Sequence, residues 1–253
     1  MYLIVCILGL LIGSFLNVCI YRIPKGESIA FPPSHCSSCS HPLAPVDLIP
    51  VFSFIFLKGK CRYCKEKISV RYPLVEILVS VLFLLVYHQY GLTLNGLAYM
   101  VLVCAVITAS FIDLDHMIIP NSVNLFIGIT GVIFMLMGWT VTWKQSFFGF
   151  CAGGGILLFL GLAAIWVFKK EGMGGGDIKL AAACGLYLGM NKMLLSLFLT
   201  TYLTAFIMLI LLAVRKLKRG QYVPFGPFLS SGIIIITLFY NEIIILYDRI
   251  ISN

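Results

Sequence analysis

The amino-acid sequence predicts an all-α membrane protein, a polytopic helical bundle of about eight transmembrane helices with a small cysteine-rich loop. Of its 253 residues, 60% are hydrophobic and only 11% are charged, whereas charged residues make up about 25% of soluble globular proteins. The mean hydropathy is +1.03. The apolar residues form runs long enough to cross a lipid bilayer, so we expect no large water-soluble domain.

The first apolar run begins at the amino terminus. No basic residue precedes it and no small-residue cleavage site follows it, so we expect a retained helix and not a removed signal peptide. Polar breaks separate the runs that follow. The expected spans are residues 2–20, 73–90, 94–112, 122–142, 146–168, 178–190, 193–214 and 226–246.

The sixth expected span, residues 178–190, is the weak point of this topology. It has only 13 residues, whereas a membrane-crossing helix usually needs about 20. It could therefore re-enter the membrane without crossing. The basic run from Arg215 to Arg219 would then face outward, against the distribution of charge in the rest of the chain, so we expect the span to cross.

Basic residues predict the orientation, because Lys and Arg are enriched in the cytoplasmic loops of membrane proteins. The loop from Arg22 to Arg71 holds eight of them. If this loop is cytoplasmic, fifteen basic residues lie inside and only Lys144, Lys192 and Arg249 lie outside. The amino terminus is then outside the cell. The same distribution explains the net charge of +8, and we expect no nucleic-acid partner.

The chain is expected to fall into two parts. Residues 1–92 hold a helix pair and the polar, cysteine-rich loop between its two helices. Residues 93–253 form a compact helical bundle with short loops. We therefore expect two domains, joined near residue 92.

The cysteine-rich loop carries two CxxC motifs, Cys36-Ser-Ser-Cys39 and Cys61-Arg-Tyr-Cys64, with 21 residues between them. This spacing is close to that of a four-cysteine zinc site, in which each motif aims two thiolates at one tetrahedral ion. Two disulfides are the alternative, but thiols stay reduced in the cytoplasm. We therefore expect a structural zinc ion held by the four cysteines. His35 and His41 flank the first motif and could substitute as ligands, but four cysteines already complete the shell.

Two acidic segments stand at the expected cytoplasmic ends of apolar spans. Asp113 and Asp115 close the third span, and Asp177 follows Gly174-Gly175-Gly176 at the start of the sixth. An ionisable group at membrane depth is costly, so it indicates a functional site. The alternative is that these acids only cap helices, where an aspartate near the first turn is favourable.

Asp113 and Asp177 are expected on the same side of the membrane, where the fold can bring them together. Two adjacent carboxylates share one proton. The ionised acid can then deprotonate a water while the protonated acid polarises a scissile carbonyl. The glycines before Asp177 permit a positive φ and leave room for an extended substrate. These features favour an intramembrane aspartic protease, which needs no cofactor for cleavage.

Several motifs together resemble those of type IV prepilin peptidases. They are Gly174-Gly-Gly-Asp177 within the segment 172–180, Asp113-Leu-Asp-His-Met-Ile-Ile-Pro120, Gly13-Ser-Phe-Leu-Asn-Val18, Arg71-Tyr-Pro-Leu-Val-Glu76 and the paired CxxC loop. The resemblance covers nearly the whole chain. It implies a membrane aspartic peptidase with Asp113 and Asp177 as the catalytic pair and Asp115 as the secondary acid. It also implies a multi-pass location in the bacterial inner membrane.

The resemblance also implies the substrate and a second activity. The substrates would be type IV prepilin or pseudopilin precursors, in which a basic leader precedes an apolar helix embedded in the bilayer. Longer members, which carry the CxxC loop, methylate the new amino terminus with S-adenosylmethionine. On this resemblance residues 1–92 are associated with methyl transfer. The candidate residues are Gly13, Asn17, Arg22 and Glu76.

Two other functional classes are open to the same residues. An ion-coupled transporter would use the aspartates as coupling acids, but it predicts inverted repeats and broken helices near the midplane, and the sequence has no clear repeat. A non-catalytic, zinc-bearing membrane scaffold explains the loop. It leaves the glycine-rich aspartate segment without a role.

Overall fold

The computed structural model of the chain describes residues 1–169, 173–214 and 223–251. They divide into two compact units, Met1–Gly96 and Leu97–Asn253. Lys170 and the basic residues from Arg215 to Arg219, which entered the orientation prediction, lie outside the described residues. The all-α prediction is confirmed, since the described residues contain helices, turns and two isolated bridges but no strand.

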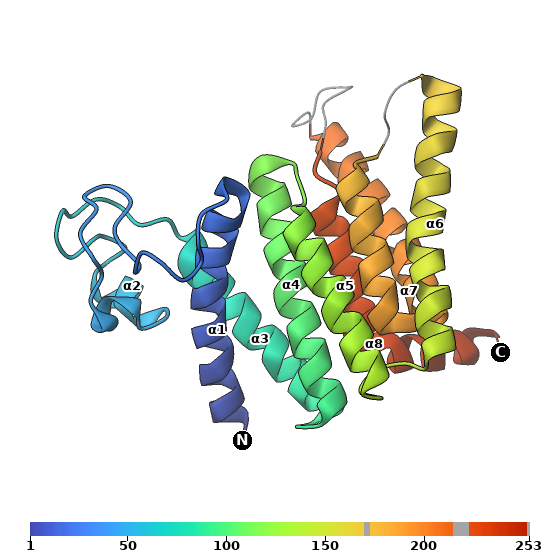
Figure 1. Ribbon diagram of the computed structural model, residues 1–253, viewed down its shortest axis with the longest axis horizontal. Coiled ribbons are helices and arrows are strands. Elements are labelled where there is room, and N and C mark those ends of the chain that lie inside the picture. Colours follow the sequence, from blue (N-terminus) through green and yellow to red (C-terminus); the bar gives the residue numbers. More distant parts are fainter. Residues whose placement is uncertain (170–172, 215–222, 252–253) are drawn as a thin grey trace. The chain divides into compact units, whose positions relative to one another are not determined.

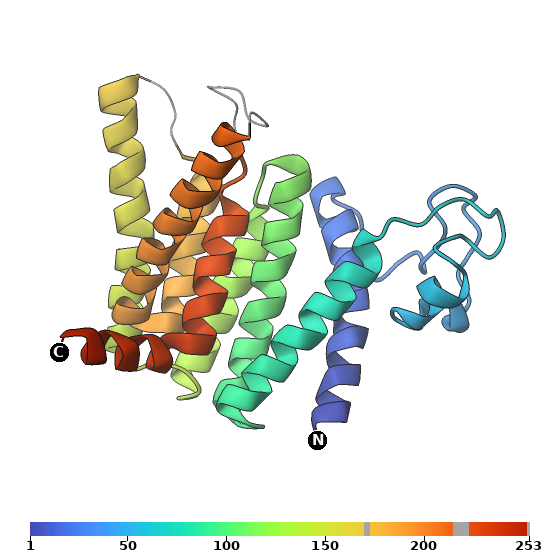
Figure 2. The same ribbon diagram turned by 180° about the vertical axis from the view of Figure 1, so that it is seen from behind.

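The first unit contains two long helices, α1 (Tyr2–Arg22) and α3 (Arg71–Tyr90), on either side of the cysteine-rich loop. That loop carries three short helices, η1 (Ile23–Lys25), η2 (Pro45–Leu48) and α2 (Phe52–Phe56). Figures 1 and 2 show α1 and α3 side by side, with the loop at one end of the pair.

The helices α1 and α3 pack antiparallel in a single register. Tyr2 stacks edge-on against Tyr87, and a Cβ added to Gly9 would lie 2.5 Å from Cα of Ser80. Asn17 donates a hydrogen bond to the carbonyl of Tyr72. Glycine on the interface lets two membrane helices approach closely, and this close packing fixes both ends of the loop.

The second unit contains five helices, except that the first three residues of α4 belong to the first unit. The five are α4 (Leu94–His116), α5 (Asn121–Leu136), α6 (Trp143–Phe168), α7 (Gly175–Ala213) and α8 (Gly226–Ile251). Across the described residues of the whole chain, six helices are long and apolar enough to span a membrane: α1, α3, α4, α6, α7 and α8. Helix α5 is apolar but shorter. It ends at Leu136, before the expected residue 142, and Gly138 follows with a φ of 71°.

Helix α7 combines the sixth and seventh expected spans in one stretch of 39 residues. A straight helix of that length would extend about 58 Å, nearly twice the thickness of the hydrocarbon core. Gly189 interrupts it with φ 72° and ψ 174°. Figures 1 and 2 show the two halves side by side, so the short sixth span is the first arm of a helical hairpin.

Small residues bring α6 against α7. A Cβ added to Gly149 would lie 2.8 Å from the backbone of Gly189, and one added to Gly153 would overlap the backbone of Ala181. On the other side of α7, Tyr187 donates a hydrogen bond of 2.7 Å to Thr130 of α5. The first arm of α7 is therefore held between α5 and α6.

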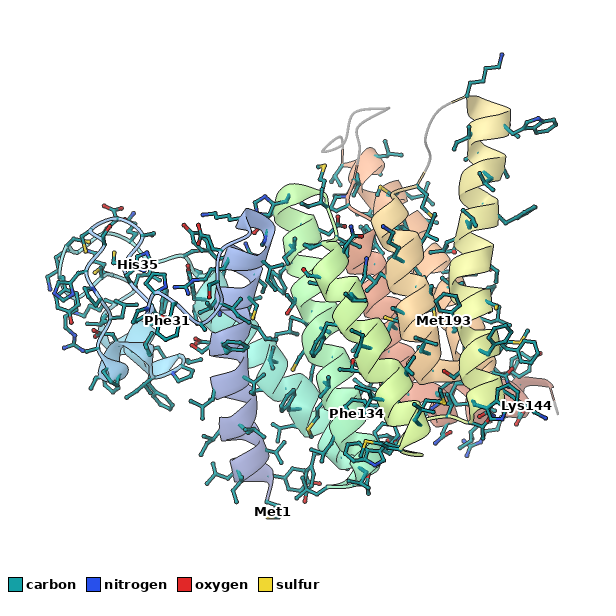
Figure 3. All side chains as sticks on the ribbon, viewed as in Figure 1. Met1, Phe31, His35, Phe134, Lys144 and Met193 are labelled. Carbon is teal, nitrogen blue, oxygen red and sulfur yellow. The ribbon has the colours of Figure 1, made fainter. Side chains whose placement is uncertain are left out.

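Helix directions in the second unit bring three helix ends together. The last turn of α4 and the first turns of α7 and α8 lie at one end of the unit (Figure 1). Lys144, at the start of α6, lies at the opposite end (Figure 3). The shared end is where Asp113 and Asp177 are found.

Candidate functional site

Asp113 lies in the last turn of α4 and is buried, with 5% of its surface exposed. Its Oδ2 accepts a hydrogen bond of 2.8 Å from the backbone N–H of Gly226. Gly226 is the first residue of α8, so the carboxylate faces the positive end of a helix dipole. A Cβ at position 226 would lie 2.7 Å from the same oxygen. Glycine therefore permits this contact.

Asp177 lies in the first turn of α7 and is also buried, with 9% of its surface exposed. Its Oδ1 is buried and has no hydrogen-bond partner among the described residues. A buried polar atom without a partner is costly, and such an atom in a native protein indicates a binding or catalytic role. The helix-capping alternative does not account for this oxygen.

The fold brings Asp113 and Asp177 together from helices that are 64 positions apart in sequence. Their carboxylates are close enough to interact electrostatically. Both are buried, so their repulsion is weakly screened. A pair of this kind retains one proton between its two members.

The three glycines before Asp177 matter because they have no side chains. None of them has a positive φ among the described residues, so the left-handed conformation that glycine permits is not used here. A Cβ added to Gly176 would lie 3.0 Å from Cβ of Ile119, whereas one added to Gly175 would meet nothing within 4 Å. Gly176 therefore allows close packing against Ile119, and Gly175 leaves open space beside the segment that carries Asp177.

Asp115 lies two residues beyond Asp113 on α4 and is exposed. It belongs to the same short segment but points away from the buried position that Asp113 occupies. His116 is exposed as well. The buried pair of acids therefore consists of Asp113 and Asp177, and Asp115 is not part of it.

Two residues near the acids were not predicted from the sequence. Gly226 lies in Pro224-Phe-Gly-Pro227, a proline-rich helix start that indicates a tight backbone but no particular partner. Asn124 of α5 donates a hydrogen bond of 3.3 Å to the carbonyl of Gly176. An asparagine within an apolar segment is visible in the sequence, and it could have marked Asn124 as a candidate site residue.

The cysteine-rich loop brings together Cys36, Cys39, Cys61 and Cys64, whose Sγ atoms all lie within 4.8 Å of one another. The Sγ atoms of Cys36 and Cys64 are 3.8 Å apart. Tetrahedral ligands at a Zn–S distance of about 2.3 Å would be about 3.8 Å from each other. The four sulfurs therefore fit a metal ion of this size.

The two CxxC motifs form knuckles with the same backbone pattern. The N–H of Cys36 donates to the carbonyl of His41, and the N–H of Cys61 donates to that of Glu66. Ser40 and Lys65, four residues after the first cysteine of each knuckle, both have a positive φ. The two knuckles therefore have the same local conformation, as expected if each supplies two ligands to one metal ion.

Hydrogen bonds to one thiol of the first knuckle favour metal binding. The backbone N–H groups of Cys39 and Ser38 lower the pKa of the Cys36 thiol to about 6, which favours the thiolate that binds metal. His41 stacks on Tyr63 with ring centroids 3.6 Å apart, and so it joins the two knuckles without supplying a ligand. Figure 3 labels His35 in the same loop, where its Nδ1 lies 3.2 Å from the carbonyl of Pro33.

Asp47 connects η2 to the second knuckle. It forms an ion pair of 2.6 Å with Arg62 and accepts hydrogen bonds from Tyr63 and from the N–H of Ala44. Burial opposes ionisation of Asp47, but the bonds from Arg62 and Ala44 outweigh it and lower the pKa of the carboxyl.

The four residues that the family resemblance associates with methyl transfer lie together around the base of the loop. A Cβ on Gly13 would lie 2.7 Å from Cα of Glu76. Oε2 of Glu76 accepts a bond of 2.7 Å from the N–H of Val51. Arg22 donates to the carbonyls of Ser28 and Pro32, at 2.9 and 2.7 Å. Arg22 and Glu76 therefore attach the loop to α1 and α3, while Gly13 and Asn17 join the two helices to each other.

Comparison with protein families gives two matches. Residues 7–90 match the bacterial peptidase A24 N-terminal domain. Residues 100–210 match the type IV leader peptidase family. Each aspartate segment lies inside the second match, and the cysteine-rich loop lies inside the first.

Comparison with individual proteins gives similarity along nearly the whole chain. The prepilin leader peptidase/N-methyltransferase of Neisseria gonorrhoeae is 38% identical, over 91% of this chain and 88% of that protein. The protein of the same name from Bacillus subtilis (strain 168) is 33% identical, over 97% of both chains. That from Aeromonas hydrophila is 34% identical, over 90% of this chain and 87% of that protein. No solved structure was found to match the chain.

Proposed function

The chain belongs to the type IV leader peptidase family, and we propose that it cleaves the leader peptide of prepilin-like precursors with Asp113 and Asp177. Like the relatives named for both activities, it is a peptidase with N-methyltransferase activity. The observation that carries the catalytic assignment is the buried pair of acids from α4 and α7. The transporter and scaffold alternatives are not favoured, because the similar proteins share the name of an enzyme.

The hydrogen-bond partners of the two acids support different roles for them. Asp113 accepts the N–H of Gly226 at a helix amino terminus, which stabilises a carboxylate. Asp177 has one oxygen without a partner, which is free to face the reacting groups. We assign the negative charge to Asp113 and the shared proton to Asp177.

Cleavage then proceeds by general acid–base catalysis. Asp113 takes a proton from a water molecule while the water oxygen bonds to the scissile carbonyl carbon. Asp177 gives its proton to the carbonyl oxygen, which forms a neutral gem-diol. The C–N bond then breaks as the amine nitrogen takes the proton from Asp113 and the gem-diol returns a proton to Asp177. Both acids return to their starting state.

The proposal is tested by incubating the purified protein with a prepilin-like precursor and measuring the product mass. The expected product lacks the leader. With S-adenosylmethionine present, we expect that loss together with one added methyl group. A precursor of unchanged mass would reject the proposed function, and leader loss without methylation would leave a peptidase alone.

Gly226→Ala is expected to slow cleavage by about 10- to 100-fold with little change in the amount of folded protein. The new methyl group would lie 2.7 Å from Oδ2 of Asp113, so it displaces the carboxylate or the start of α8. Gly155→Ala is the matched control, because a Cβ at position 155 meets nothing within 4 Å. Equal cleavage rates for the two variants would contradict a role for the Gly226 contact.

We further propose that residues 1–92 supply the methyl-transfer function and residues 93–253 the peptidase. S-adenosylmethionine would supply the methyl group. Gly13, Asn17, Arg22 and Glu76 are positioning residues in this proposal. The first two join α1 to α3, and the last two attach the loop to these helices. The metal is proposed to be zinc held by Cys36, Cys39, Cys61 and Cys64. It would have a structural role, since four thiolates fill a tetrahedral shell.

Glu76→Ala is expected to lower methylation by about tenfold while cleavage changes by less than about twofold. The change leaves the N–H of Val51 without its acceptor, so the loop loses one of its attachments to α3. Glu76→Gln should restore methylation, because its amide oxygen can accept the same bond. Methylation and cleavage are measured on one precursor by mass. Equal loss of both activities would contradict a role confined to the loop.

The chain is a bacterial inner-membrane protein, as its spanning helices and relatives indicate. We propose that the amino terminus is outside and that the cysteine-rich loop and both acids are cytoplasmic. The eight basic residues between Arg22 and Arg71 support this orientation. The precursors that the enzyme meets there would belong to pilus, secretion or DNA-uptake systems.

A further inference from the structure

An open groove of about 690 Å³ runs along the second unit. One wall is α5 from Asn121 to Ile133, and the other is α7 from Lys179 to Leu186. Phe150 of α6 also lines the groove. We call it the α5–α7 groove. Every element that lines it belongs to the second unit.

The groove has the length and polarity of a site for an apolar helix. At 1.5 Å per residue, the wall between Asn121 and Ile133 is about 18 Å long, more than half of the hydrocarbon thickness. Its lining is apolar except at one end, where Asn121, Asn124 and Lys179 lie. The small residues Gly128 and Ala182 would allow a helix backbone to approach closely.

The polar end of the groove lies next to the segment that carries Asp177. Asn124 donates a hydrogen bond to the carbonyl of Gly176, the residue before Asp177. Lys179, two residues after Asp177, donates a bond of 2.8 Å to Asn121. A molecule in the groove therefore has its end within one helical turn of Asp177.

Asn124 presents an unused acceptor at this end. It is 6% exposed, and its Oδ1 is buried without a hydrogen-bond partner among the described residues. A lipid chain in the groove has no donor to offer it. A peptide that leaves its helical conformation near the acids exposes backbone N–H groups, which would satisfy it.

We propose that the α5–α7 groove binds the apolar helix of the precursor directly after the bond that is cut. This inference rests on the proposed function and adds the binding site for the membrane-embedded part of the substrate. The helix lies along α5, and its amino-terminal end unwinds at Asn124. The scissile bond then reaches the acids, and the leader extends into the open space beside Gly175.

Gly128→Leu tests the groove, because a side chain at position 128 fills it without displacing a neighbour. A Cβ there meets nothing within 4 Å. With a full-length precursor in liposomes, KM is expected to rise about tenfold, equal to about 1.4 kcal/mol of binding. Gly128→Ala should have a smaller effect. The value of kcat should change little, since the acids are untouched.

Gly155→Leu is the matched control, since it adds the same side chain at an open position of α6 outside the groove. A second control is a short soluble precursor peptide that keeps the leader and the cleavage point but lacks the apolar helix. The effect of Gly128→Leu should be confined to the full-length precursor. A wild-type KM for Gly128→Leu on that precursor would overturn the inference. Failure of the wild-type protein to cleave either substrate would reject the proposed function itself.

Photo-crosslinking identifies the occupant directly. A photoreactive residue at Val132, in the groove, should form an adduct with the full-length precursor. The same group at Phe159, exposed on α6, should form much less. Adducts at Val132 only with lipid, or only with the chain's own residues 1–96, would contradict binding of the precursor helix.

Discussion

Asp177→Asn and Asp113→Asn are each expected to lower the rate of leader cleavage by about 10³-fold or more. Asparagine keeps the size of the buried side chain but can neither accept the proton of the attacking water nor donate one in a shared pair. The two acids act as one unit, so the double variant should be no less active than either single variant. Rates are measured by product mass on the same precursor.

Asp248→Asn is the control for these variants, because Asp248 is exposed near the far end of α8. Its cleavage rate should equal that of the wild-type protein. Asp115→Asn tests the choice between the acids of α4. An Asp115 variant as inactive as the Asp113 variant would contradict the assignment of the pair. A normal yield of folded protein shows that lost activity is not lost insertion.

Cys36→Ser combined with Cys61→Ser is expected to abolish metal binding, because it removes one thiolate from each knuckle. Structural zinc in small domains contributes about 10 kcal/mol or more of apparent free energy. Without it the loop between α1 and α3 should become readily cleaved by added protease. Elemental analysis should fall from one zinc per chain to none, with methylation lost.

Cys151→Ser is the matched control for the cysteine variants. Cys151 lies exposed on α6, outside the four-cysteine cluster, so zinc content should remain at one per chain. Unchanged metal content in the double variant would count against the site. Cleavage of the leader should survive in the double variant, because Asp113 and Asp177 lie in the other unit.

The sequence predicted the helical segments well, because an apolar run of spanning length is determined locally. The hairpin of α7 shows how much of the fold local composition can predict. Composition predicted two spans around residues 191 and 192, and the reversal is made by Gly189, whose φ of 72° is accessible to glycine. The end of α5 was misplaced because residues 137–142 carry no charge, while Gly138 ends the helix.

The candidate site was predicted in part for a related reason. Asp113 and Asp177 were marked by charge at membrane depth, a property of each residue alone. The contact between Gly226 and Asp113 joins residues 113 positions apart, and one sequence holds no signal for such a pairing. The acceptor of Asn124 likewise became visible only when α5 was placed beside the start of α7.

The α5–α7 groove is open along its side, and this affects how substrate concentration should be expressed. A helix that enters sideways stays in lipid throughout, which avoids the cost of exposing its apolar surface to water. Encounter then occurs by diffusion in the plane of the bilayer. The rate should follow the mole fraction of precursor among the lipids, so diluting the vesicles in buffer should leave the turnover per enzyme unchanged.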